Sequence, residues 1–214
     1  MKTLYLDTSS SFLYTAIQND NEIIAEIKEK LDNNLSKYAL SRIEGMFKIK
    51  NISFDEIDKI IVVNGPGSFT GIRIGLTIAK TLAWAKKIPI VPISSLQAMA
   101  LSADSNHDYV VPAIDARRNY LYASIYDNQN KQFIMNEKYV SLDTLHIALE
   151  NLAGSIVFIT NDKLDINYDK EPYDPKISLI IDEFKSKDGI NPHSIDANYL
   201  KLTEAEEKKK NGVL

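Results

Sequence analysis

The sequence predicts an α/β protein with two lobes, each built on the order βββαβ. Short apolar runs typical of buried strands alternate with stretches whose apolar residues recur at helical spacing. The order of strands and helices in the first half recurs in the second half, with little sequence identity between the copies. The 214 residues, of which 44% are hydrophobic, suffice for one or two compact lobes with a buried core.

The first half opens with three predicted strands in a meander, over 3–6, 12–17 and 22–30, separated by turn-forming polar clusters. Apolar residues at helical spacing then predict a helix over 33–47 that Asn33 or Asn34 caps. The other elements expected here are a helical turn over 53–58 with Ser53 as cap, a buried strand over 60–63, a helix from the glycine-rich segment to about Lys86, a buried strand over 88–93, and a helix capped by Ser94 or Ser95 that ends near Ala103.

The second half repeats the pattern. Strands are predicted over 109–114, 121–126, 133–140 and 156–160, helices over 142–152, 177–184 and 195–209, and a polar loop over 161–175. Two copies of βββαβ are the outline of a ribonuclease-H-like pair of lobes. Residues 1–104 are expected to form the N-terminal lobe and 105–190 the C-terminal lobe, with a C-terminal helix in 191–214 packing back on the first lobe.

Composition excludes several classes of protein. The chain has no cysteine, so disulfide scaffolds and thiolate metal sites are excluded. Its net charge is −4, and its one basic run, Lys208–Lys210, follows acidic residues and is interpreted as a solvated helix end, so any contact with nucleic acid is expected to be indirect. Asp7 interrupts the first apolar run too early for a signal peptide, and no window approaches the roughly 20 apolar residues of a membrane span, so a cytoplasmic protein is expected.

The segment Gly65–Gly75, GPGSFTGIRIG, follows a predicted buried strand and opens a helix. One interpretation is a phosphate-binding loop, because glycines permit unusual backbone angles and free N–H groups at a helix start attract anions. The segment lacks both the Walker pattern and the Gly-x-Gly-x-x-Gly pattern of dinucleotide-binding proteins. The other interpretation is a tight strand-to-helix connection with Ser68 or Thr70 as the helix cap.

The helix that follows carries small residues every four positions, at Gly71, Gly75, Ala79 and Ala83. Glycine costs about 1 kcal/mol relative to alanine inside a helix, so two glycines on one face indicate a close backbone approach. The rest of this helix is apolar nearly all round, which predicts burial on nearly all sides. The small-residue face is therefore expected to meet another helix, either of this chain or of a partner.

The sequence holds no recognisable catalytic cluster. Its three histidines, His107, His146 and His193, are scattered and lie in no metal-binding pattern, and Gly-x-Ser-x-Gly is absent. Asp7 and Asp115 each follow the first strand of a lobe. A pair of carboxylates so placed suits magnesium on a nucleotide, but each aspartate is also an ordinary turn residue.

The glycine-rich segment resembles the signature of the TsaB family, also called YeaZ. Further stretches match the family in the same order, and they are LYLDTS at 4–9, IPIV at 88–91, SSL at 94–96, AIDAR at 113–117 and YLK at 199–201. The match is dense through residue 126 and sparse afterwards. The eleven-residue segment is long enough to be specific, and the other stretches support it by their order.

The resemblance implies an actin-like ATPase (ASKHA) fold and a role in forming N6-threonylcarbamoyladenosine at tRNA position 37. It implies a non-catalytic subunit that pairs with the catalytic paralogue TsaD through its first two helices and recruits the ATPase TsaE. The small-residue face of the helix over 71–86 is self-complementary, so a homodimer is expected to be able to form when TsaD is absent. TsaD holds a metal through H-x-x-x-H on its first helix, whereas this chain has Leu35 and Ala39 at those positions. TsaB proteins often retain one histidine there, so Leu35 departs from the family, and no metal or peptidase chemistry is expected.

Two sets of site residues are expected. The partner interface is placed on the helices over 33–47 and 71–86, at Leu35, Ala39, Ile43, Met46, Gly71, Ile72, Gly75, Leu76, Ala79 and Ala83. Contacts to a nucleotide are placed at Asp7, Thr8, Ser9, Gly67, Ser68, Arg73 and Asp115. ATP or ADP with magnesium is expected only at the interface of the complex. The alternatives are an ATP-dependent transferase or kinase of the same fold and, more remotely, a glycopeptidase-like metallopeptidase, which the missing histidines oppose.

Overall fold

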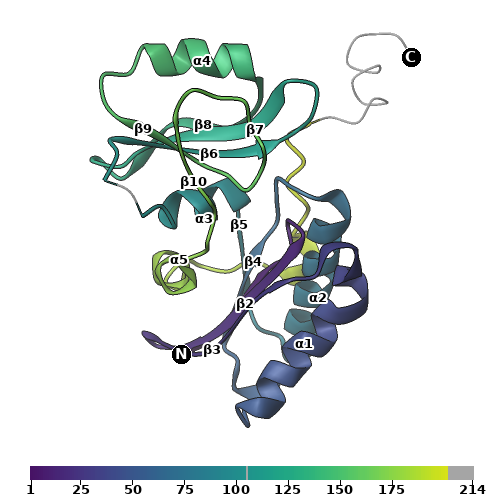
Figure 1. Ribbon diagram of the computed structural model, residues 1–214. Helices are drawn as coiled ribbons and strands as arrows, with labels where there is room; N and C mark the ends of the chain where they lie inside the picture. The colour runs from purple at the N-terminus through teal and green to yellow at the C-terminus, as the bar shows by residue number, and fades with distance from the viewer. Residues whose placement is uncertain (105, 202–214) are drawn as a thin grey trace.

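The computed structural model describes residues 1–104 and 106–201 and contains two five-stranded sheets (Figure 1). The layers follow in the order two helices, first sheet, two helices, second sheet, one helix. Each sheet therefore has apolar helices on both of its faces, which explains why its central strands are almost entirely apolar. The predicted α/β fold of two lobes is confirmed.

The first sheet has the strand order β3-β2-β1-β4-β5. Its strands are β1 (Lys2–Asp7), β2 (Phe12–Asn19), β3 (Glu22–Lys30), β4 (Lys59–Val63) and β5 (Ile90–Ile93). The first three form the predicted antiparallel meander, and β4 and β5 extend it in parallel from β1. The carboxyl ends of β1, β4 and β5 therefore meet at one edge of the sheet, where ligands of parallel sheets usually bind.

The second sheet repeats this order. Its strands are β6 (Tyr109–Asp115), β7 (Tyr120–Asp127), β8 (Gln132–Ser141), β9 (Ile156–Ile159) and β10 (Asp169–Glu171). Across the sheet they run β8-β7-β6-β9-β10, which matches the first sheet strand for strand. The predicted loop over 161–175 is wrong at β10, which pairs in parallel with β9. Its three residues are polar and too few to show the alternation of a strand.

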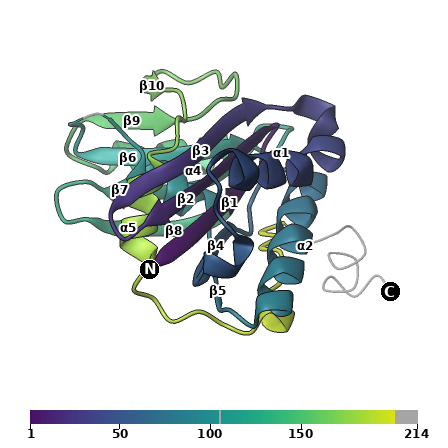
Figure 2. The same cartoon turned by 90° about the horizontal axis from the view of Figure 1, so that it is seen from below.

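Two long helices, α1 (Leu35–Ile49) and α2 (Phe69–Lys86), lie side by side on the outer face of the first sheet (Figure 2). A short 3-10 turn, η1 (Asp32–Asn34), precedes α1, and Asn34 holds the N-cap position without a side-chain capping bond. The corresponding helix of the second lobe, α4 (Leu142–Glu150), packs on the outer face of the second sheet.

The inner layer is shared by the two lobes. The helix α3 (Ser95–Leu101) follows the first sheet in sequence but packs on β6 and β7, while α5 (Ile177–Phe184) follows the second sheet and packs on β1 and β2. Ile177 and Ile180 lie against Tyr5 and Tyr14 of the first sheet. The predicted boundary after residue 104 thus separates the sheets but not their cores, because each sheet takes an inner helix from the other half of the chain.

Two predicted caps are confirmed. Ser53 forms a capping box with Glu56 at the short helix η2 (Phe54–Glu56), and Ser94 forms one with Gln97 at α3. In each box the serine oxygen accepts a backbone N–H of the first turn, and the longer side chain accepts the N–H of the serine.

The predicted helix over 195–209 is wrong for residues 195–201, which run without regular structure after the 3-10 turn η3 (Pro192–Ser194). Ile195 is buried in the core of the first lobe, and its carbonyl accepts a hydrogen bond from Lys80 at 2.8 Å. The backbone is therefore held by α2 and not by a helix of its own. The rest of that prediction and the basic run 208–210 lie outside the described residues. Among the described helices, none has the length and apolarity needed to cross a membrane.

We expect Ile180→Ala to lower the free energy of unfolding by about 2–5 kcal/mol, because it removes a fully buried side chain between α5 and the first sheet. The matched control is Leu179→Ala, one residue away on the same helix but half exposed, with an expected effect within about 0.5 kcal/mol. Urea denaturation of both variants checks this. Equal effects would contradict the packing of α5 on the first sheet.

Candidate functional site

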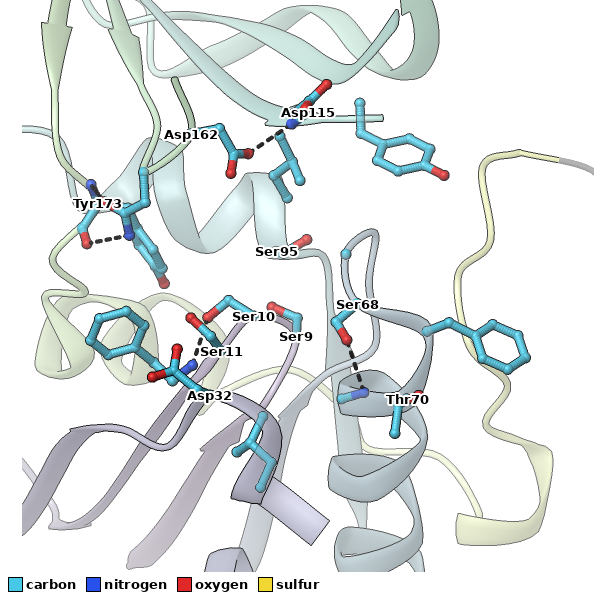
Figure 3. A pocket seen from close by; sticks show the side chains of 18 of the residues that line it. Ser9, Ser10, Ser11, Asp32, Ser68, Thr70, Ser95, Asp115, Asp162 and Tyr173 are labelled. Carbon is cyan, nitrogen blue, oxygen red and sulfur yellow. Dashed lines mark hydrogen bonds between the residues drawn. The ribbon is translucent and has the colours of Figure 1, made fainter. Parts of the chain in front are cut away.

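A cleft of about 1120 Å³ separates the two lobes at the carboxyl edges of both sheets. The first lobe contributes the turn Ser9–Ser11 and the segment from Gly67 to Gly71, while Asp115, Asp162 and neighbouring residues come from the second lobe. Figure 3 shows Ser9, Ser10, Ser11 and Asp32 on one side of the cleft and the carboxylates of Asp115 and Asp162 on the opposite side. Because the two sheets repeat one topology, the cleft is bounded on both sides by the ends of equivalent strands.

The glycine-rich segment forms one wall of the cleft. Ser68 is the N-cap of α2, and its hydroxyl accepts the N–H of Gly71 at 3.2 Å, which confirms one of the two predicted caps. Gly65 and Gly67 have φ angles of 117° and 152°, in the region that favours glycine. A methyl group on Gly67 would overlap the carbonyl oxygen of Ser9, so the glycine also allows two backbones to approach. The segment is therefore a tight connection that borders the cleft.

The small-residue face of α2 lies against the β1–β2 turn. Methyl groups on Gly71 and Gly75 would overlap the carbonyl oxygen and the hydroxyl of Thr8, respectively. The Thr8 hydroxyl donates to the carbonyl of Gly71 at 2.7 Å, and Thr8 is 1% exposed. The expectation of a second helix at this face needs correction, because the close approach is made by a turn of the same chain.

The ten residues expected at the partner interface are all buried within the first lobe in this structure. Gly71 and Gly75 lie against Thr8. The other eight belong to the core between the helix pair and the sheet, and they are Leu35, Ala39, Ile43, Met46, Ile72, Leu76, Ala79 and Ala83. Helical spacing identified a buried face correctly, but that face is turned toward the sheet. A surface for a partner on these helices must use their outward side chains.

The residues expected to contact a nucleotide fall into two groups. Ser9, Gly67, Ser68 and Asp115 line the cleft. Asp7, Thr8 and Arg73 do not: the first two are 1% exposed beneath the turn, and Arg73 bonds the Tyr199 hydroxyl at 3.0 Å on the outside of α2. The structure therefore does not place Asp7 and Asp115 together in the cleft as a magnesium site. Over the described residues, no group of three or more His, Asp or Glu side chains is arranged to hold a metal.

Asp7 is a buried acid. Its carboxylate accepts the backbone N–H of Ser9 at 2.8 Å, and burial raises its pKa above the ordinary value, against the lowering effect of that bond. Burial also raises the pKa of Tyr5 and Tyr173, and the nearby Asp7 charge adds to both shifts. The hydroxyls of both tyrosines are buried as well. Asp7 is thus placed in a low-dielectric cluster of acidic groups under the floor of the cleft.

Sequence reasoning missed Asp162 and Tyr173 on the far side of the cleft. The Asp162 carboxylate accepts the backbone N–H of Asp115 at 2.7 Å, and Asp115 accepts the N–H of Arg117 at 2.8 Å. A signal for Asp162 was available, because it lies just after β9, the parallel neighbour of β6, and the ends of such strands meet at one edge. No comparable signal marks Tyr173, which reaches the cleft from an irregular stretch after β10.

The histidines stay apart, as the sequence predicted. His107 pairs with Asp169 at 3.0 Å, His146 lies 5.5 Å from the Tyr168 ring between centroids, and His193 is exposed in η3. Leu35 and Ala39 are buried on α1. The described residues therefore provide hydroxyls and three carboxylates, those of Asp32, Asp115 and Asp162, around the cleft. This set is able to bind a polar ligand.

Comparisons with known proteins match a TsaD family model and curated relatives named TsaB. Residues 22–171 match the family model described as "TsaD: tRNA N6-adenosine threonylcarbamoyltransferase". The chain is 30% identical over 224 aligned positions to the tRNA threonylcarbamoyladenosine biosynthesis protein TsaB of Bacillus subtilis (strain 168), with 97% of each chain covered. It is 37% identical over 123 positions to the protein of that name from Haemophilus influenzae, covering 56% of this chain and 52% of that one.

A solved structure shows the same fold. YeaZ from Pseudomonas aeruginosa superposes with a TM-score of 0.73 over 93% of this chain and 99% of that chain, at 19% sequence identity. At this level of identity the likeness supports the architecture alone.

We expect Gly75→Ala to destabilise the fold by about 1–3 kcal/mol, because the added methyl group would overlap the Thr8 hydroxyl. The control is Gly45→Ala on α1, where a methyl group meets nothing within 4 Å, and a gain of up to about 1 kcal/mol is expected. Adding Thr8→Ala to Gly75→Ala should restore part of the loss by removing the overlapping hydroxyl. Thermal denaturation of these variants and of Thr8→Ala alone checks this, and effects of Thr8→Ala and Gly75→Ala that simply add in the double variant would contradict the contact.

We expect Asp7→Asn to be more stable than the wild type at neutral pH. Because the folded-state pKa is raised, the folded protein binds the proton of Asp7 more tightly than the unfolded chain does. Protonation of Asp7 therefore stabilises the fold at low pH, and this stabilisation is lost as the pH rises through the folded-state pKa. Asparagine resembles the protonated side chain at every pH, so the difference in Tm should shrink below roughly pH 4.

The control for this pH series is Asp20→Asn. Asp20 is exposed and accepts a hydrogen bond from the N-terminal amine at 2.7 Å, which lowers the pKa of its carboxyl group. The stability that Asp20 adds to the fold is therefore present above the pKa of the unfolded chain and is lost as the pH falls through the folded-state pKa. Melting curves between about pH 3 and pH 8 should show opposite trends for the two variants. A constant Tm difference for Asp7→Asn across that range would rule out a raised pKa.

Proposed function

The chain belongs to the TsaB family, and from that premise we propose that it is the non-catalytic partner of TsaD in forming N6-threonylcarbamoyladenosine at tRNA position 37. The observation that carries the proposal is the outward face of the α1–α2 pair. This face presents large apolar side chains to solvent, while the described residues hold no group of three or more His, Asp or Glu side chains arranged for a metal.

The partner surface is proposed on the solvent side of α1 and α2. Leu40 and Ile49 on α1 are 56% and 83% exposed, and Trp84 on α2 is 63% exposed. Apolar side chains that remain this open on adjacent helices are typical of a surface that another protein covers. The ten buried residues of the helix pair support this surface from below, because they fix both helices on the sheet.

The proposal assigns catalysis to TsaD. Asp7 is buried under the cleft floor, so the pair with Asp115 that an ATP-dependent transferase or kinase would need is not arranged in the cleft. Nucleotide with magnesium is proposed only for the assembled complex, as are recruitment of the ATPase TsaE and indirect contact with tRNA. The net charge of −4 supports the last point, since a chain that bound tRNA alone would usually carry a basic face.

We expect Trp84→Glu to weaken binding to TsaD by roughly 30-fold or more, as removal of a central apolar anchor does at other interfaces. Because Trp84 is exposed, the Tm of the variant should stay close to that of the wild type. The control is Ile147→Glu on α4, equally exposed at 63% but on the other lobe, and it should bind TsaD normally. Titration calorimetry with purified TsaD measures both. Normal binding by Trp84→Glu together with weak binding by Ile147→Glu would place the interface elsewhere.

We expect the isolated chain to turn over neither ATP nor a threonylcarbamoyl donor, and TsaD to form the modified nucleoside on tRNA only when the chain is added. Reconstitution with purified components and nucleoside analysis of the tRNA tests this. Magnesium-dependent ATP hydrolysis by the chain alone, abolished by Asp115→Ala, would overturn the non-catalytic assignment.

A further inference from the structure

The last described residues, 195–201, cross from the first lobe to the second beside the cleft (Figure 1). We call this segment the strap. In Figure 1 it is the yellow trace that rises from α2 toward the second sheet. The strap forms hydrogen bonds to both lobes, through its backbone and through its side chains.

Contacts to the first lobe anchor the strap along α2 and at the end of β4. Asn198 donates its backbone N–H to the carbonyl of Asn64 at 2.8 Å, and the Asn64 side chain donates to the carbonyl of Asp196 at 3.1 Å. The ring of Tyr199 stacks on Phe69 with 5.3 Å between centroids. Two hydrogen bonds with Asn64 and one aromatic stack therefore hold the strap on the first lobe.

Contacts to the second lobe converge on Glu137 of β8. The Glu137 Oε2 atom accepts the side-chain N–H of Asn198 at 2.8 Å and the hydroxyl of Ser94 at 2.9 Å. Ser94 belongs to the first lobe, as the N-cap of α3. One carboxylate of the second sheet thus accepts hydrogen bonds both from the strap and from the first lobe, and the Lys201 ammonium group adds a contact 5.2 Å from the Tyr139 ring centre.

The strap also supports the glycine-rich wall of the cleft. A Cβ atom on Gly65 would lie 2.8 Å from the carbonyl oxygen of Asn198, so the two backbones touch. From the other side, Ser95 donates its N–H to the carbonyl of Gly65 at 3.0 Å and its hydroxyl to the carbonyl of Pro66. The connection 65–67 is consequently held between the strap and the start of α3.

We propose that the strap is a latch that fixes the angle between the two lobes, with Glu137 as its point of attachment on the second lobe. When the bonds to Glu137 are broken, the second sheet is free to rotate away from α2, the cleft widens, and the connection 65–67 loses its outer support. The carboxylate is half-buried, and hydrogen bonds to a charged acceptor that is shielded from water are among the stronger ones in proteins. All of these contacts lie within this chain, so the latch does not depend on which protein binds to α1 and α2.

The absence of native cysteine permits a direct test. Lys37→Cys on α1 and Glu150→Cys on α4 place one spin label on each outer helix layer, at exposed positions. Pulsed electron–electron double resonance then measures the distribution of distances between the two spin labels, one on each lobe. We expect one narrow distribution in the wild-type background and a broader one, shifted to longer distances, with Asn198→Ala or Glu137→Met.

The matched control is Tyr199→Phe, which removes the bond to Arg73 but keeps the stack on Phe69 and every contact to Glu137. Its distance distribution should equal that of the wild type. In parallel, amide exchange in residues 65–71 should be about 10- to 100-fold faster in Asn198→Ala than in the wild type or the control, as expected for loss of a hydrogen bond to a charged group.

Glu137→Met keeps the length of the side chain and removes both acceptor oxygens, so this variant should fold even if Asn198→Ala does not. Unchanged distances and unchanged exchange in the folded Glu137→Met variant would overturn the proposal. Equal widening in Tyr199→Phe would also overturn it, because the strap would then be held by its first-lobe contacts and Glu137 would have no special part.

Discussion

The rest of the first lobe depends on the close contact between the β1–β2 turn and the start of α2. Thr8 donates its hydroxyl to the carbonyl of Gly71, and the carbonyl of Ser9 accepts the N–H of Ser68 at 2.7 Å. Only glycine at positions 71 and 75 leaves room for the turn. This contact fixes the direction of α2, and α2 in turn fixes the wall of the cleft at one end and the outer helix layer along its length.

The cleft and the proposed partner surface both include α2, but they lie on different sides of this helix. The first turn of the helix borders the cleft, whereas its solvent side, with α1, forms the proposed partner surface. A partner covering the outer helices would therefore leave the mouth of the cleft open to a small molecule. Any effect of one site on the other would be carried by the position of α2 relative to the turn, because the contact at Gly71 and Gly75 leaves no free space to absorb a shift.

Much of the fold follows from local sequence signals. Apolar runs and helical spacing located nearly all the strands and helices, and serine caps with Glu56 or Gln97 three residues later marked two helix starts. Signals of this kind report which face of an element is buried but not what buries it. For that reason the small residues of α2 were assigned to a second helix, when a turn carrying Thr8 lies there, and the apolar face of α5 gave no sign that it belongs on the first sheet.

The site was less predictable than the fold because it depends on where side chains point at strand ends. Asp7 and Asp115 occupy equivalent places in the two lobes and each accepts the N–H of the residue two positions on, yet Asp7 is buried while Asp115 lines the cleft. Asp162 becomes identifiable only when β9 is known to lie next to β6. Arg73 stands near the glycine-rich segment in sequence, but helical geometry carries it to the far side of α2, where it meets Tyr199.

The exchange of inner helices between the lobes has a consequence for the order in which the chain acquires its structure during synthesis. The inner face of the first sheet, around Tyr5 and Tyr14, is fully covered only when α5 packs on it, because α3 contributes little more than Ala98 to this core. Until those residues emerge from the ribosome, the first sheet exposes a broad apolar face, and contacts so distant in sequence form slowly. The nascent N-terminal half is therefore the stage at which this protein most needs protection by a chaperone against aggregation.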